Sequence, residues 1–226
     1  MDGDGQLNNP ALERCLQRSQ ELEAALVDVL LDEGQYVQWD DSARTTSSCL
    51  AAELAFEHWS AVRVLMATEH PRSATALVRL EYEAIVRSAW LLHAASEDEV
   101  ATMQQALTTD SEKRAGELPF FGLMLKALEG TAPARLYEDL QHIKVNMSKS
   151  LNSFVHSGIH ALQRGEHGYP LLLALQVVHT ANALGTMAAM MLANLTGDPA
   201  KGSQINLLIP AYRDCLPPLR PIAAAT

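Results

Sequence analysis

Apolar residues recur along most of the chain at the three- and four-residue spacing of amphipathic helices. In the first such segment, ALERCLQRSQELEAALVDVLL, Pro10 suits a first helical turn and Gly34 follows as a stop. The same signals predict further helices at about 45–69, 73–95, 96–116, 119–130, 133–164, 170–196 and 204–215. A break near Asn146 is left open, and strand signals are scarce. The pattern therefore predicts an all-α, single-domain bundle of about seven or eight helices.

The expected bundle divides into three parts along the chain. Residues 1–44 form an N-terminal helix and connector, residues 45–197 form the core, and residues 198–226 form a short helix and a tail. No shift in composition marks a domain boundary between these parts. We therefore expect one domain overall.

The segment from Leu171 to Thr196 contains no charged residue and is long enough to span a bilayer. Polar side chains interrupt it, however, at Gln176, His179, Thr180, Asn182 and Asn194. No second segment of this kind accompanies it, which favours a buried core helix over a membrane span. The three cysteines are far apart and form no CxxC motif, which fits a reducing compartment. We expect a soluble cytoplasmic protein that does not bind membranes.

The charge balance and the missing motifs exclude several functional classes. The formal net charge is −10, so the surface repels nucleic-acid phosphates unless basic residues are concentrated locally. Aromatic residues make up only 5% of the chain, too few for a platform that stacks single-stranded bases. The sequence contains no GxGxxG, Walker-type or GxSxG motif. We expect no cofactor.

One polar stripe interrupts the apolar helix predicted at 73–95. Arg79, Glu83 and Arg87 follow one another at four-residue steps and therefore share one helix face. If the stripe is buried, its charges must be paired. The stripe has three interpretations: an internal ion-pair ladder, an anion site in which Glu83 orients an arginine, or a solvated face.

A second stripe is expected on the helix at 133–164. Asn152, His156, His160 and Arg164 also repeat every four residues, and Lys149 lies nearby. Histidine exchanges protons near neutral pH, so this face invites a catalytic interpretation. Two histidines at this spacing could also share a metal, but no third ligand is evident, and we predict no metal site. The alternatives are histidines hydrogen-bonded inside the bundle, or histidines used at a cleft or a dimer interface.

The segments HPRSATALVRLEYEAIVRSAWLLHAAS and LNSFVHSGIHALQR carry a resemblance to an uncharacterised bacterial family of helical proteins near the HEPN-like clan. The resemblance covers roughly residues 45–197. Similarity to HEPN domains implies a helical bundle and homodimerisation. It also implies, in many members, a metal-independent endoribonuclease that works in toxin–antitoxin or antiphage systems.

The motif of those nucleases is incomplete in this chain. They use an arginine, commonly followed by a polar residue such as asparagine, with a histidine a few residues further on. The resemblance places the asparagine at Asn152 and the histidine at His156, but the arginine position falls on Leu151. A shifted register makes Lys149 the basic partner, and lysine only partly replaces a planar guanidinium at a phosphate.

Two hypotheses follow, and an active centre requires the two stripes to face each other across a shared groove. In the first, the chain is a non-catalytic or degenerate HEPN-like binding protein, dimeric, that acts on a protein or small ligand in a bacterial defence, toxin–antitoxin or stress module. In the second, it cleaves RNA. His156 is then the acid/base, assisted by Lys149 and Asn152, with His160 as a second histidine. The phosphate-binding cations would be Arg79, Arg87 and Arg164, with Glu83 as the orienting carboxylate.

Overall fold

The structure of the protein is a computed structural model that describes residues 7 and 9–218, except for the side chains of residues 147–149. The described residues form ten α-helices and one 3₁₀ helix. Their only β-pairing is an isolated bridge between Asp32 and Gln35. The prediction of an all-α fold is confirmed.

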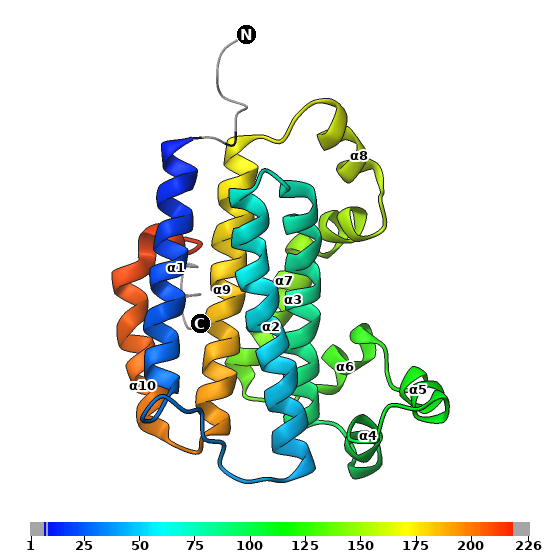
Figure 1. Ribbon diagram of the computed structural model, residues 1–226. Helices are drawn as coiled ribbons and strands as arrows, with labels where there is room; N and C mark the ends of the chain where they lie inside the picture. The colour runs from blue at the N-terminus through cyan, green and yellow to red at the C-terminus, as the bar shows by residue number, and fades with distance from the viewer. Residues whose placement is uncertain (1–6, 8, 219–226) are drawn as a thin grey trace, which may run out of the picture.

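Four long helices lie side by side and form the centre of the molecule (Figure 1). They are α1 (Pro10–Leu30), α2 (Ala43–Ala67), α3 (Pro71–His93) and α9 (Leu171–Leu195). A tight turn joins α2 to α3, so the two run antiparallel as a hairpin. The two helices approach each other closely, and the hydroxyl groups of Ser48 and Ser88 lie 3.0 Å apart in the interior.

The uncharged helix α9 is in the core, and its polar side chain Asn182 is fully buried. The amide oxygen of Asn182 accepts hydrogen bonds from Ser19 on α1 and from the Trp59 indole on α2, the latter at 2.8 Å. Its amide nitrogen donates to the carbonyl of Cys215 at 2.7 Å. By length and hydropathy, α9 is the one helix of the described residues that could cross a membrane, and half of its most apolar window is buried in the bundle. A core helix of a soluble protein has these properties.

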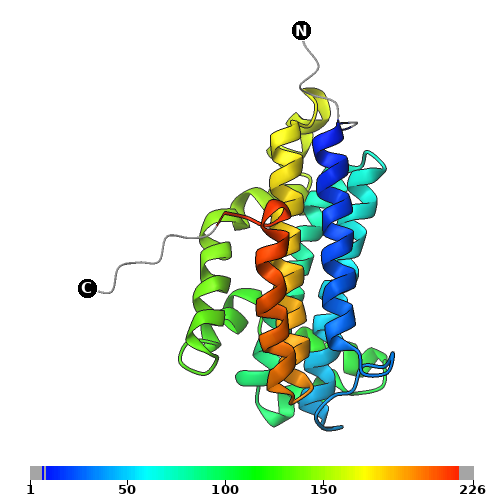
Figure 2. The same cartoon turned by 90° about the vertical axis from the view of Figure 1, so that its left-hand side faces the viewer.

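The remaining elements surround the four long helices. Helix α10 (Pro199–Leu208) and the 3₁₀ helix η1 (Ile209–Cys215) pack against α1 and α9, whereas α7 (Ala134–Val155) packs against α3 (Figure 2). The short helices are α4 (Glu97–Met103), α5 (Thr109–Gly116), α6 (Phe121–Ala127) and α8 (Ile159–Glu166). Buried apolar residues form one cluster that extends from Leu12 to Leu216, so all three expected parts contribute to it. The end of the predicted tail, residues 219–226, lies outside the described residues.

The expected number of helices is too low, because three predicted helices are each divided. The segment 96–116 becomes α4 and α5, since Thr108 and Ser111 form a capping box that starts a new helix. The segment 133–164 becomes α7 and α8, with the division after Val155 and not near Asn146. The segment 204–215 is covered by the end of α10 and by η1, with the division after Leu208. At the first of these divisions, capping residues inside a periodic segment start a new helix.

Helix α1 ends at Leu30 and not near Gly34, and Lys201 explains this end. The buried ammonium group of Lys201, on α10, donates to the carbonyls of Val29 and Leu30 at 3.1 Å each. It also donates to the Asp32 carboxylate at 2.9 Å. The last carbonyls of a helix lack partners within it, and a cation is favourable there. Since this partner is about 170 residues away in sequence, no local pattern could identify it.

We expect Lys201→Ala to lower the free energy of unfolding by about 2–4 kcal/mol, because buried carbonyls lose charged hydrogen bonds. Urea unfolding followed by circular dichroism measures this loss. Asp32→Ala is the control: its side chain is 59% exposed, so we expect a loss under about 1 kcal/mol. Equal losses in the two variants would contradict a capping role for Lys201.

Candidate functional site

A groove between α3, α6 and α7 holds the largest concentration of the predicted site residues. Its volume is about 570 Å³, and we call it the cationic groove. Its lining consists of Arg79, Glu83, Arg87, Phe120, Phe121, Gly122, Met124, Lys144 and Asn152. Three cationic side chains face one carboxylate here, in a chain whose net charge is −10. The groove therefore concentrates positive charge locally on an acidic protein.

Arg79 is held on several sides at the base of the cationic groove. Its Nη2 pairs with Glu83 Oε1 at 2.7 Å, and its Nε donates to Asn152 Oδ1 at 2.9 Å. The guanidinium carbon lies 4.2 Å from the centroid of the Phe121 ring, within range of a cation–π contact. Only 7% of the residue is exposed, and its Nη1 is buried without a hydrogen-bond partner. Glu83 and Asn152 thus hold the Arg79 guanidinium in one orientation, and its Nη1 makes no hydrogen bond.

Tyr82 fixes the two walls of the cationic groove to α3. Its side chain is fully buried, and its hydroxyl donates to the carbonyl of Leu140 on α7 at 2.6 Å. Its ring meets that of Phe121 on α6 edge-on, with centroids 5.1 Å apart. Burial raises the pKa of the Tyr82 hydroxyl well above its usual range, so it stays a neutral donor. The groove therefore has rigid sides.

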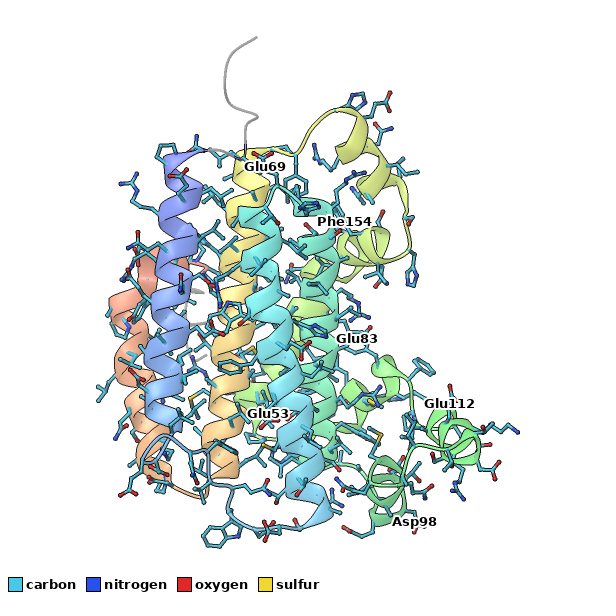
Figure 3. The ribbon with its side chains drawn as sticks, viewed as in Figure 1. Glu53, Glu69, Glu83, Asp98, Glu112 and Phe154 are labelled. Carbon is cyan, nitrogen blue, oxygen red and sulfur yellow. The ribbon has the colours of Figure 1, made fainter. Side chains whose placement is uncertain are left out.

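The predicted arginine ladder is only half formed. Arg79 and Glu83 are paired, and Glu83 projects from α3 on the side of α6 (Figure 3). Arg87 lies one turn further along, partly exposed, and makes no ion pair with any residue that the structure describes. Lys144, on the opposite wall, is also partly exposed and is not paired within the described part of the chain. Two cations at the rim are therefore available to a ligand.

The predicted histidine stripe is wrong, because its helix is interrupted. Helix α7 ends at Val155, and Ser157 adopts a left-handed conformation, with φ of +53°. A Cβ at Gly158 would lie 2.6 Å from Ser153 Oγ, so glycine is needed at this close approach. The Ser153 hydroxyl instead accepts a hydrogen bond from the backbone of His160 at 3.0 Å, at the start of α8. Residues on either side of the break do not share one face.

The structure consequently separates the predicted residues. Asn152 lines the cationic groove with Arg79, Glu83 and Arg87, whereas His156, His160 and Arg164 do not. Both histidines are exposed. Lys149 belongs to α7, but its side chain lies outside the described residues.

Arg164 serves a different neighbour. It lies on α8 near the buried Tyr169 hydroxyl. Burial raises the pKa of Tyr169 to about 12, and the hydrogen bond between Tyr169 and Thr75 and the charge of Arg164 oppose this shift. Across the described side chains, no three His, Cys, Asp or Glu residues are grouped so that they could hold a metal ion.

Sequence reasoning missed Lys144 and the two phenylalanines of the groove. Lys144 lies eight residues before Asn152, which is about two helical turns, so a shared face was detectable. Phe120 and Phe121 follow Pro119 in a segment without a marked pattern. Only the packing of α6 against α3 brings them to the groove.

Sequence reasoning also missed Glu81, which is fully buried on α3 and makes no hydrogen bond through either carboxyl oxygen. Burial raises the pKa of this carboxyl well above its ordinary value, and the charge of Arg63 opposes the shift only in part. Arg63 itself is bonded to Glu23 and to Ser60 and stacks on the Trp59 ring. Burial thus favours the neutral form of Glu81, which lies inside the bundle and outside the lining of the cationic groove.

The fold and the site together define an all-α helical bundle with a cationic groove between its third, sixth and seventh helices. The chain belongs to DUF6988, a family of unknown function, whose model matches residues 52–218. That match begins within α2 and ends beyond η1, so it includes every residue that lines the groove. No curated protein and no solved structure matches the chain.

Proposed function

We propose that the protein is a non-catalytic binding protein whose cationic groove holds a small anionic ligand, a phosphate or a carboxylate. The observation that carries this proposal is the lining of the cationic groove, in which Arg79, Arg87 and Lys144 face a single carboxylate. An anionic oxygen in the groove would receive charge-assisted hydrogen bonds from cations of this kind.

The surroundings of Arg79 suit such a ligand. Glu83 and Asn152 hold the guanidinium in one orientation, so little side-chain entropy is lost when a ligand binds. Arg87 and Lys144 add positive charge at the rim. The volume of about 570 Å³ is typical of small-molecule sites.

The groove supports the binding hypothesis more than the ribonuclease hypothesis. Cleavage of RNA requires a proton-transfer group next to the phosphate, and no histidine belongs to the lining. Leu151, at the position of the nuclease arginine, is buried in the core. His156 caps the end of α7, one turn beyond Asn152. Catalysis would require it to move into the groove.

The resemblance to HEPN-like proteins is the basis for the proposed oligomeric state, compartment and biological role. On that basis we expect a homodimer that acts in the cytoplasm, in a bacterial defence, toxin–antitoxin or stress module. These expectations depend on the resemblance, and the groove depends on the contacts described above. The two can therefore be tested separately.

Titration calorimetry with inorganic phosphate tests the groove. We expect saturable binding, weakened about 10-fold or more in Arg79→Met and about 5-fold in Lys144→Met, since each removes a charged contact. Arg114→Met, on the exposed helix α5, should bind as the unmodified protein does. Circular dichroism confirms that each variant is folded.

Absence of phosphate binding, or equal affinity in all variants, would overturn the proposal. A parallel assay incubates the protein with mixed RNA in the presence of a metal chelator. Cleavage that disappears in His156→Ala would replace the binding hypothesis with the catalytic one.

A further inference from the structure

A second groove lies on the other side of α3, between α2, α3 and α4, and its lining is mostly apolar. We call it the apolar groove; its volume is about 330 Å³. Leu50, Leu54, Leu80 and Met103 line it and are 36–57% exposed. These four large apolar side chains face solvent in one hollow, where they can cover part of a hydrocarbon chain.

The two grooves share a boundary on α3. Glu83 and Arg87 line the cationic groove and the apolar groove alike. Three cations therefore line one of two adjoining grooves, and apolar side chains line most of the other. Arg87, unpaired within the described residues, stands where the two ends meet.

We propose that the ligand is an anionic amphiphile: its head occupies the cationic groove and its alkyl chain lies along the apolar groove. This inference rests on the proposed function and specifies its ligand. Opposite chemistries in adjoining hollows match a molecule that joins an anion to a hydrocarbon chain. Each methylene that is buried raises affinity about fourfold, so the chain supplies most of the binding.

The size of the apolar groove and the net charge of the protein argue against a protein partner and against a membrane as the ligand. A stable protein partner buries about 1,200–2,000 Å², whereas a hollow of about 330 Å³ has the size of a small-molecule site. An anionic bilayer is repelled by a protein with a net charge of −10. The ligand is therefore taken up as a single molecule from solution.

Calorimetry with ethyl phosphate and decyl phosphate, both below the micelle concentration, tests the proposal. We expect decyl phosphate to bind at least about 50-fold more tightly than ethyl phosphate, because part of its chain is buried. Decyltrimethylammonium has the same chain with a cationic head. We expect it to bind at least about 10-fold more weakly than decyl phosphate, since like charges repel.

Substitutions in the apolar groove separate the chain from the head. In the double variant Leu54→Ser/Leu80→Ser, we expect affinity for decyl phosphate to fall about 10-fold or more and affinity for ethyl phosphate to stay unchanged. Leu207→Ser is the matched control, because Leu207 is 79% exposed and lies on α10. It should bind both compounds as the unmodified protein does.

The outcomes distinguish the two proposals. Ethyl phosphate binding without any gain from the longer chain would overturn the amphiphile and leave the anion site. Absence of binding by both compounds would overturn both. If Leu207→Ser lost as much affinity for decyl phosphate as the double variant, the binding would be unspecific adsorption. If the protein sedimented with phosphatidylglycerol vesicles and did not bind dissolved decyl phosphate, the ligand would be a membrane. Either result overturns the amphiphile proposal.

Discussion

Gly185→Ala is expected to lower the free energy of unfolding by about 3 kcal/mol or more, which is a large share of the stability of a protein of this size. A Cβ at position 185 would overlap the ring of Trp59, which packs directly against the backbone of α9. The ring has no room to retreat, because Trp59 is fully buried and its indole is bonded to Asn182. Urea or thermal unfolding measures the loss.

A matched glycine makes this prediction specific. Gly202 also lies within a helix, and a Cβ there would meet only the end of Met190 at 3.7 Å, an ordinary contact. Gly202→Ala should therefore leave stability unchanged or raise it by up to about 1 kcal/mol. In the double variant Gly185→Ala/Trp59→Leu, the total loss should be smaller than the sum of the two single losses. Strict additivity would show that the overlap with Trp59 is not the cause.

Glu81→Gln is expected to remove a marked pH dependence of stability. Because burial raises the pKa of Glu81 in the folded state, the folded protein keeps this proton to a higher pH than the unfolded chain, whose carboxyl titrates near about 4.3. Between those two pKa values the folded state binds the additional proton. The free energy of unfolding therefore falls by about 1.4 kcal/mol per pH unit as the pH rises.

Urea unfolding at pH 5, 6, 7 and 8 measures this effect. The unmodified protein should lose stability across this range relative to Glu81→Gln, until the pH passes the raised pKa of the carboxyl. Glu81→Met should also be more stable at pH 7 by about 1–3 kcal/mol, since an apolar side chain leaves no buried polar atom unpaired. Glu57→Gln, on the exposed face of α2, is the control and should keep the slope. Parallel pH profiles for the protein and Glu81→Gln would contradict the prediction.

The long helices could be predicted because their signals are local. The apolar spacing and the uncharged run that becomes α9 are properties of short windows of sequence. The division between α7 and α8 could not be predicted, because it depends on the contact of Gly158 with Ser153 across the turn. The same applies to the end of α1, where the capping lysine comes from α10.

The candidate site divides in the same way. The four-residue spacing of Arg79, Glu83 and Arg87 correctly places them on one side of α3, next to Asn152. The histidines were placed with them only by assuming that one helix continues from residue 133 to residue 164. Nothing in the sequence around Glu81 distinguishes it from an exposed acidic residue. Its burial follows from the packing of α2 against α3. Single-sequence patterns describe helix faces, but they do not show which face is covered.

The hydrogen bonds of Asn182 bear on how the chain can assemble during synthesis. Its partners come from α1, α2 and η1, so they enter the growing chain at residues 19, 59 and 215. Until residue 215 has been made, the amide nitrogen of Asn182 has no carbonyl to receive its hydrogen. A nascent chain that ends between residues 182 and 215 therefore lacks this partner, and the hydrogen bonds of Asn182 are completed only when residue 215 is made.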